Sequence, residues 1–241
     1  MNAQSQSSTL NPQVIKALSW LVTLLMPVVL VMAAVRLLLT PAFLIIEYNT
    51  PGFPPDSYGF TKSERLIWSK IAVEYLLNDA DVNFLGDLRF PDGKQAPAES
   101  CRAMDDCTRL YNDRELKHML DVKVVTQAAL RVWYISLAVL LLLYIWAWRG
   151  GWWGAFRQGM GRGGWLTVFL LAGIILFVML AFGVIFVAFH NVFFEAGTWQ
   201  FLFSDTLIRL FPERFWRDTF IAIGLLAGST GLALGYFLRE K

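Results

Sequence analysis

Charged side chains are scarce in this sequence. Only 17% of its 241 residues are Asp, Glu, Lys or Arg, whereas soluble domains contain about 25%. There are 21 Lys and Arg against 19 Asp and Glu, an excess too small for a nucleic-acid-binding protein. The hydrophobic share of 56% excludes a disordered chain and an ordinary soluble enzyme. We therefore expect no nucleic-acid partner.

Cysteine and histidine are also rare, with two of each in the chain. Two cysteines cannot by themselves form a zinc finger or an iron–sulfur site. The sequence contains no nucleotide-binding loop, no Gly-x-Ser-x-Gly elbow and no His-Glu-x-x-His motif. These absences exclude several common classes of enzyme, and we expect neither a cofactor nor a metal.

Long apolar runs are present in place of charge. A helix needs about 20 apolar residues to cross the hydrocarbon core of a bilayer. Four runs are long enough: Ala17–Leu39, Val132–Trp148, Leu166–Phe189 and Phe220–Leu238. The sequence therefore predicts an all-α membrane protein with four transmembrane helices.

Basic residues set the expected orientation in the membrane. Three arginines and no acid lie between the second and third runs: Arg149, Arg157 and Arg162. The positive-inside rule makes this loop cytoplasmic. Both termini are then also cytoplasmic, in agreement with the basic residues Lys16, Arg239 and Lys241. We expect a multi-pass protein of the plasma membrane, with its N- and C-termini inside and its cap on the extracytoplasmic side.

The predicted topology divides the chain into seven segments. They are a leader with the first span (1–46), an extracytoplasmic cap (47–123), the second span (124–148), a cytoplasmic loop (149–165), the third span (166–190), an aromatic outer loop (191–219), and the fourth span with the C-terminus (220–241).

The cap contains two predicted helix starts. Thr61 and Glu64 have the spacing of a capping box, and apolar residues then recur with helical spacing until about Asn78. Residues 79–100 are rich in Asp, Gly and Pro and predict irregular structure. Asn112 and Glu115 predict a second helix that continues into the second span. The cap is therefore expected to be mainly helical.

Cys101 and Cys107 both lie in the predicted cap. A disulfide persists in an extracytoplasmic compartment. We expect this pair to form a disulfide that closes a loop of the cap.

The predicted outer loop is unusually aromatic. Phe193, Phe194 and Trp199 lie in its first half, and further Phe and Trp residues follow. One interpretation is anchoring at the membrane interface, where such rings are common. The other is a ring-lined pocket for acyl chains, to which these three residues would contribute.

The two histidines are the best candidates for chemistry. His118 precedes the second span and His190 ends the third, so both are expected at the outer leaflet. Glu115 and Asp121 lie three residues on either side of His118, where each could hydrogen-bond its ring. Asn191 adjoins His190 and is a further supporting candidate. The alternatives are ordinary polar groups at the interface, or a zinc site formed by the histidines with Asp121.

Arg36 and Arg131 fall near the predicted outer ends of their spans. Charges at such positions usually extend to the membrane interface. They can also bind a lipid headgroup or a carbonyl oxygen, which makes them candidate substrate-binding residues.

The helical rise predicts a constraint on the histidines. With straight helices, the two rings would differ in height by about 9 Å, too far for one reacting centre. For a shared site, we expect a tilted or bent second span, with the two imidazoles within about 8 Å of each other.

The segments RELKHMLDV and FHNVFFEAGTWQFLFSDTLIRLFPERFWRD together resemble the lipoprotein intramolecular transacylase family. The resemblance implies transfer of the sn-2 acyl chain of a diacylglyceryl lipoprotein to the amine of its N-terminal cysteine, which produces a lyso-form lipoprotein. It also implies that His118 and His190 are the catalytic pair, and that a lipoprotein substrate and membrane lipid are the partners.

One alternative from another functional class remains. A non-enzymatic accessory subunit of a larger membrane complex would show similar spans and aromatic residues. In such a subunit a histidine could ligate a haem or a pigment.

Overall fold

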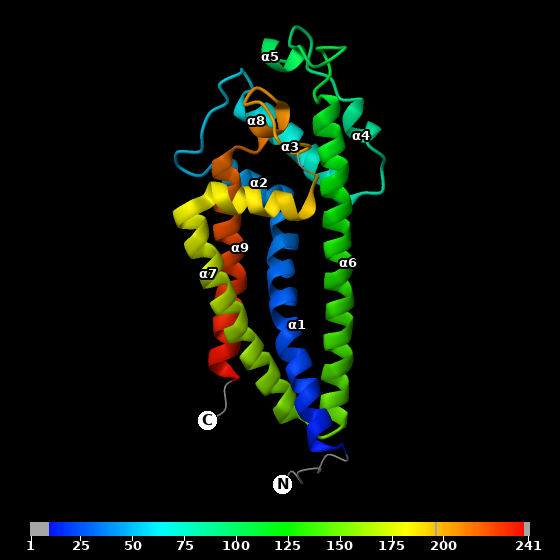
Figure 1. Ribbon diagram of the computed structural model, residues 1–241, viewed down its shortest axis with the longest axis vertical. Coiled ribbons are helices and arrows are strands. Elements are labelled where there is room, and N and C mark those ends of the chain that lie inside the picture. Colours follow the sequence, from blue (N-terminus) through cyan, green and yellow to red (C-terminus); the bar gives the residue numbers. More distant parts are fainter. Residues whose placement is uncertain (1–9, 196, 239–241) are drawn as a thin grey trace. The chain divides into compact units, whose positions relative to one another are not determined.

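The computed structural model describes residues 10–195 and 197–238. Their helices are α1 (Pro12–Leu38), α2 (Pro41–Tyr48), α3 (Lys62–Leu77), α4 (Asn83–Gly86), α5 (Ala98–Cys101), α6 (Asp113–Arg149), α7 (Trp153–Phe193), α8 (Thr206–Leu210) and α9 (Glu213–Phe237) (Figure 1). Within these described residues, β pairing is limited to an isolated bridge between Arg89 and Arg109. The expected all-α fold is confirmed.

In the described part of the chain, four helices are long and apolar enough to cross a membrane, namely α1, α6, α7 and α9. They contain the four apolar runs of the sequence, so the predicted number of spans is confirmed. The first part of the predicted leader, residues 1–9, lies outside the described residues, as do Arg239 and Lys241.

The chain forms two compact units. We call the first the span unit, with described residues 10–36, 129–177 and 221–238. The second, the cap unit, contains residues 37–128 and 178–220, with Ala196 outside the description. The helices α6 and α7 contribute residues to both units.

Small residues bring helices of the span unit close together. A Cβ atom on Gly163 of α7 would lie 2.5 Å from the Cβ of Met26 on α1. Thr23 of α1 donates a hydrogen bond of 3.2 Å to the carbonyl oxygen of Gly159. Because glycine lets backbones approach, such contacts replace the hydrophobic driving force that is weak between helices in lipid.

The same glycines explain a difference from the sequence prediction. The segment 149–165 was expected to be a loop, but α6 ends at Arg149 and α7 begins at Trp153. The connection has Gly151 at a positive φ of 72°, a conformation that glycine adopts without steric cost. Gly150 also lies in the connection, whereas Gly159, Gly163 and Gly164 lie in α7, where they allow close approach of α1 or α9.

The cap unit contains both helix starts that the sequence predicts, after a short helix, α2, that it did not predict. Thr61 and Glu64 form the capping box of α3, which ends at a cap residue Asn78. Asn112 and Glu115 exchange hydrogen bonds between side chain and backbone at the start of α6. Both predictions are confirmed. Residues 79–100 are mostly irregular as expected, but they also include α4 and the start of α5.

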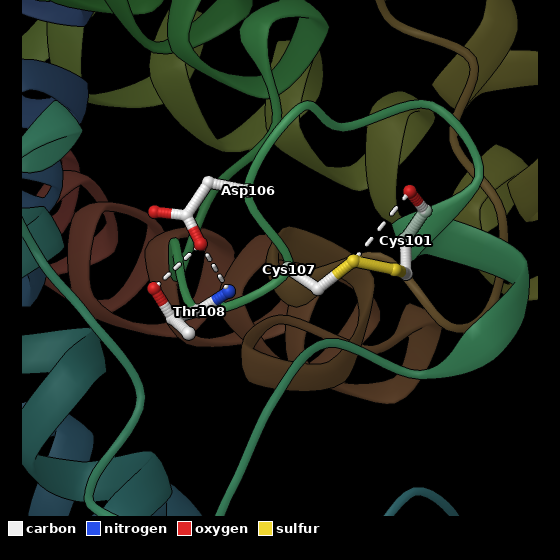
Figure 2. Close-up of a disulfide and its surroundings, with 4 residues drawn as sticks. All are labelled: Cys101, Asp106, Cys107 and Thr108. Atoms are coloured by element: carbon white, nitrogen blue, oxygen red, sulfur yellow. Dashed lines mark hydrogen bonds between the residues drawn. A yellow bond between two sulfur atoms is a disulfide. The ribbon is translucent and has the colours of Figure 1, made fainter.

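A hydrophobic core connects α3, α6 and α8 within the cap unit. Its fully buried side chains include Tyr75 of α3, Leu85 of α4, Leu110 before α6 and Leu210 of α8. The disulfide between Cys101 and Cys107 closes a neighbouring loop, in which Asp106 accepts hydrogen bonds from Thr108 (Figure 2).

The predicted aromatic loop is more helical than its composition suggested. Within 191–219, the structure has the end of α7, all of α8 and the start of α9 at Glu213. The segment without helix between α7 and α8 carries Trp199 and Phe201.

Candidate active site

The two histidines of the chain lie side by side in the cap unit. His118 of α6 and His190 of α7 have ring centroids 6.0 Å apart and planes inclined by 20°. Their exposed fractions are 8% and 9%. The prediction that the imidazoles lie within about 8 Å is confirmed.

A break in α7 precedes His190. Ala181 has φ −150° and ψ 50°, which are not helical values, so the helix axis changes direction there. No such break interrupts α6 within the described residues. A bend in the second span is therefore wrong, since the break lies in the third span, whereas a tilt of the second span stays a prediction. An extended apolar run carries no local signal that distinguishes one bent position from another.

Aromatic rings enclose the histidine pair. Phe194 and Phe201 contact His118 edge-on, with centroids 4.9 Å and 5.3 Å away. His190 packs against Phe186 at 4.1 Å and Trp199 at 4.8 Å. We call these four aromatic residues the aromatic cage. Phe186 was not a sequence-predicted site residue, although its position one helical turn before His190 could have indicated it.

The hydrogen bonds of the pair differ. His190 Nδ1 lies 2.7 Å from the carbonyl oxygen of Phe186. Since a carbonyl only accepts, Nδ1 donates, and Nε2 of the neutral ring keeps its lone pair. His118 Nδ1 and Trp199 Nε1 are buried without a hydrogen-bond partner among the described residues. Buried polar atoms are normally paired, so these two are available to a substrate.

Glu115 does not serve His118 as the sequence suggested. Its Oε2 accepts a hydrogen bond of 2.9 Å from the backbone of Asn112, and its Oε1 accepts one of 2.7 Å from the backbone of Leu207. The carboxylate thus connects the start of α6 to α8. Leu207 is 92 positions away from Glu115 in the sequence, so local spacing did not predict this hydrogen bond.

The other predicted supporting residues lie outside the immediate surroundings of the rings. Asp121 is partly buried and Asn191 is exposed, and neither hydrogen-bonds an imidazole within the described part of the chain. Phe193 is 49% exposed and contacts Phe189 rather than a histidine.

The two predicted arginines belong to the span unit. Arg131 is exposed and Arg36 is partly buried. Their predicted role in substrate binding stays a prediction.

Asp205 is a residue that sequence reasoning missed. It is 1% exposed and accepts hydrogen bonds from the side chains of Asn112 and Arg114 and from the backbone of Leu202. These contacts attach the segment after Phe201 to the start of α6. Asn112 and Arg114 are more than 90 positions away in the sequence, so local spacing gave no signal for these contacts.

The described residues contain no group of three or more His, Cys, Asp and Glu side chains arranged to hold a metal ion. A zinc site of His118, His190 and Asp121 therefore does not form among them. The two imidazoles can instead act on a substrate by accepting and donating protons.

Comparisons with known proteins agree with this geometry. The membrane integral lipoprotein intramolecular transacylase Lit of Bacillus cereus has a similar fold, with a TM-score of 0.72 at 17% identity over 93% of this chain and 94% of that chain. A form of that protein with a histidine-to-alanine substitution gives a TM-score of 0.65 at 17% identity, over 94% of this chain and 93% of that one.

Sequence similarity extends over the same length. An uncharacterized protein of Aquifex aeolicus is 29% identical over 244 residues, covering 94% of this chain and 98% of that protein. The family model for the lipoprotein intramolecular transacylase Lit matches residues 20–216. That range includes both histidines and the aromatic cage. The chain therefore belongs to the lipoprotein intramolecular transacylase family.

Proposed function

We propose that this membrane acyltransferase transfers the sn-2 acyl chain of a diacylglyceryl lipoprotein to the amine of the lipoprotein's N-terminal cysteine. The paired imidazoles, 6.0 Å apart within the aromatic cage, are the observation that carries the proposal. Membership of the transacylase family supports the enzyme interpretation over a non-enzymatic subunit.

His190 is proposed as the base. Its Nδ1 proton is held by the Phe186 carbonyl, which directs the Nε2 lone pair to another group. An α-amino group has a pKa of about 7.7–8.0, so an imidazole can accept its proton near neutral pH. As the amine attacks the ester carbonyl, a C–N bond forms and its proton passes to Nε2.

His118 is proposed as the donor to the carbonyl oxygen. That oxygen becomes negative in the tetrahedral intermediate, and an N–H group aimed at it lowers the barrier. The unpartnered Nδ1 of His118 supports this role. The bond from the carbonyl carbon to the sn-2 glyceryl oxygen then breaks, and His190 returns its proton to that oxygen. The step is balanced without a covalent acyl-enzyme.

The aromatic cage is proposed to hold the acyl chains. Rings of Phe and Trp offer apolar surface, and the donor and acceptor belong to one substrate molecule, so orientation is the main requirement. A well-oriented intramolecular reaction can gain about 7–11 kcal/mol from positioning. The cage residues Phe194 and Trp199, which the sequence analysis named for acyl binding, contact the histidines directly.

The cap is proposed to lie on the extracytoplasmic side of the plasma membrane. The disulfide of Cys101 and Cys107 supports this placement, because disulfides persist in oxidising compartments. A thiol reagent that cannot cross the membrane should label reduced cysteines of this pair in intact cells. Labelling only after lysis would contradict the orientation.

The decisive experiment is mass spectrometry of a reporter lipoprotein from cells with and without this chain. We expect the lyso form, with the cysteine amine acylated and one acyl chain left on the glyceryl group. A free amine with both chains on glycerol, in cells that express the protein, would contradict the proposal.

A further inference from the structure

A second polar site lies in the cap unit. A pocket there is lined by Pro54, Pro55, Asp56, Ser57, Tyr58, Arg65, Phe203, Ile208, Arg209 and Pro212. Two arginines, on α3 and α8, belong to this lining. Both are at least nine-tenths buried, with exposed fractions of 4% for Arg65 and 5% for Arg209.

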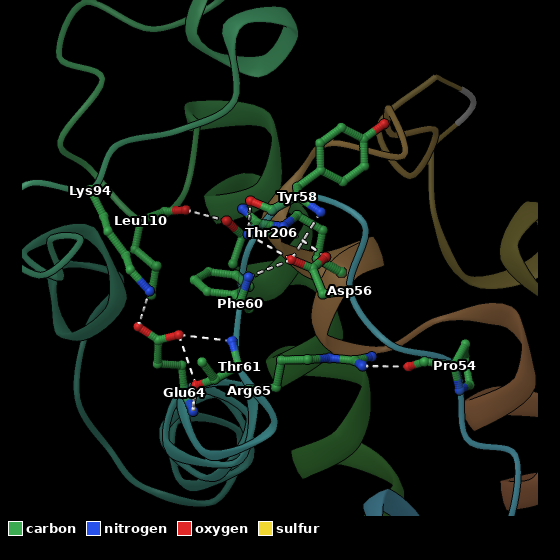
Figure 3. Close-up of polar contacts among 11 residues, drawn as sticks. Pro54, Asp56, Tyr58, Phe60, Thr61, Glu64, Arg65, Lys94, Leu110 and Thr206 are labelled. Atoms are coloured by element: carbon green, nitrogen blue, oxygen red, sulfur yellow. Dashed lines mark hydrogen bonds and ion pairs between the residues drawn. The ribbon is translucent and has the colours of Figure 1, made fainter.

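The carboxylate of Asp56 accepts hydrogen bonds from groups of the protein itself on both of its oxygens. Its carboxylate accepts hydrogen bonds from Nε and Nη2 of Arg209 at 3.1 Å and 3.0 Å. It also accepts hydrogen bonds from the backbone of Tyr58 and Phe60, two of the residues labelled in Figure 3. The negative charge of Asp56 therefore compensates the positive charge of Arg209.

Arg65 forms no ion pair with an acid among the described residues, although the nearby Asp56 attracts its charge. Its Nη1 donates a hydrogen bond of 2.7 Å to the carbonyl oxygen of Pro54 (Figure 3). Its guanidinium lies 5.0 Å from the ring centroids of Tyr48 and Phe53. Burial lowers the pKa of Arg65 below its ordinary value, a sign of the cost of this charge. The one nearby acid, Asp56, is already paired with Arg209, and a buried cation without an ion pair of its own is expensive, so this position favours an anion.

Two donor atoms at this pocket also lack partners. Arg65 Nε and Arg209 Nη1 are buried without a hydrogen-bond partner in the described chain. They belong to the two guanidinium groups that line the pocket, and two such donors suit two oxygens of one anion. Arginine is well suited to phosphate oxygens.

The remaining lining defines the class of ligand. Two arginines and one aspartate leave one positive charge, which matches the single negative charge of a phosphodiester. The prolines, Ile208 and the largely exposed Phe203 add apolar surface beside the charge. We propose that this pocket binds the phosphate of a phospholipid headgroup, with the apolar lining against the glycerol and upper acyl chain. The proposal is independent of the histidine chemistry.

Ser57 permits a test without removing a buried group. It lines the pocket and is exposed, so a substitution there should leave the fold intact. Ser57→Glu adds a negative charge to the pocket, and Ser57→Gln is a matched control of the same length without charge. Arg65→Gln removes one donor directly, with the exposed Arg89→Gln as its control.

Binding would be measured by native mass spectrometry of the full chain in detergent. The probes are dihexanoyl phosphatidylglycerol, dihexanoylglycerol without phosphate, and inorganic phosphate. We expect the wild type, S57Q and R89Q to bind the phospholipid, and S57E and R65Q to bind it at least tenfold more weakly. His118→Ala should bind it like the wild type, which separates this site from the proposed active site.

Three results would overturn the proposal. The first is equal binding of the phospholipid by S57E and S57Q, which remains decisive if R65Q does not fold. The second is equal binding of dihexanoylglycerol, since the phosphate would then be irrelevant. The third is binding of inorganic phosphate with the same affinity as the phospholipid, which would assign the pocket to free phosphate.

Discussion

His190 donates a hydrogen bond from Nδ1 to the carbonyl oxygen of Phe186 at 2.7 Å, one helical turn earlier in α7. His118 has no corresponding bond, and its Nδ1 is buried without a partner among the described residues. The two rings lie close together, but only the ring of His190 is held by a hydrogen bond from its Nδ1 among the described residues. This difference predicts that glutamine will replace the two histidines unequally, although alanine should inactivate at either position.

The first prediction concerns loss of each imidazole. His118→Ala and His190→Ala should each lower activity by about 10²–10⁴-fold, the usual contribution of a positioned acid or base. The double variant should be little worse than either single one, because residues that act as a unit are not additive. Product mass spectrometry with purified protein measures this. Multiplicative losses would indicate separate roles.

The second prediction separates the base from the donor. Glutamine keeps an N–H donor but cannot act as a base near neutral pH. His118→Gln should therefore retain more activity than His118→Ala, whereas His190→Gln should be as inactive as His190→Ala. The readout is initial rate at saturating substrate. Greater rescue at His190 than at His118 would reverse the assignment.

The third prediction concerns Asp205, whose carboxylate accepts bonds from Asn112, Arg114 and Leu202. Asp205→Asn keeps the volume but loses the charge and part of this network. We expect a loss of about 1–3 kcal/mol in the free energy of unfolding. Activity should also fall, since the nearby Phe201 packs on His118. Denaturation in detergent measures the free energy of unfolding, and Asp113→Asn, at an exposed position, is the control. Equal unfolding of both variants would refute the anchoring role.

The fourth prediction concerns pH and Glu47 of α2. Burial, and secondarily the neighbouring Asp218, raises its pKa from 4.5 to about 7. A carboxyl whose pKa is higher in the folded state stabilises the fold below pH 4.5, and this contribution is lost as pH rises through about 7. The free energy of unfolding should fall over that window. Glu47→Gln should flatten the fall, while the exposed Glu99→Gln should leave it unchanged. Identical profiles for all three proteins would contradict this account.

The fifth prediction concerns the disulfide. Replacing Cys101 and Cys107 by serine removes a short loop closure, which costs about 2 kcal/mol in the chain-entropy model. The transacylase activity should survive at low temperature, because no hydrogen bond joins either cysteine to a histidine among the described residues. Thermal unfolding and product analysis test the two parts. Complete loss of activity in a folded variant would show that the pair does more than close a loop.

Local features of the sequence were sufficient for most of the long helices, but not for the short helices α2, α4, α5 and α8. Apolar runs predicted the helices that can span a membrane, and capping residues predicted the starts of α3 and α6. These features succeed because helix formation depends on neighbours within one or two turns. The glycine-rich part of α7 was the exception, since its helical state depends on packing against α1.

The histidines themselves were also found from sequence, by their rarity, their expected common leaflet and the resemblance to a family. Their surroundings depended on the tertiary structure. The contact of Phe201 with His118 and the hydrogen bond from Leu207 to Glu115 join residues far apart in the sequence. Sequence spacing determines which residues share a helix face, but only the folded chain decides which distant backbone or ring satisfies them.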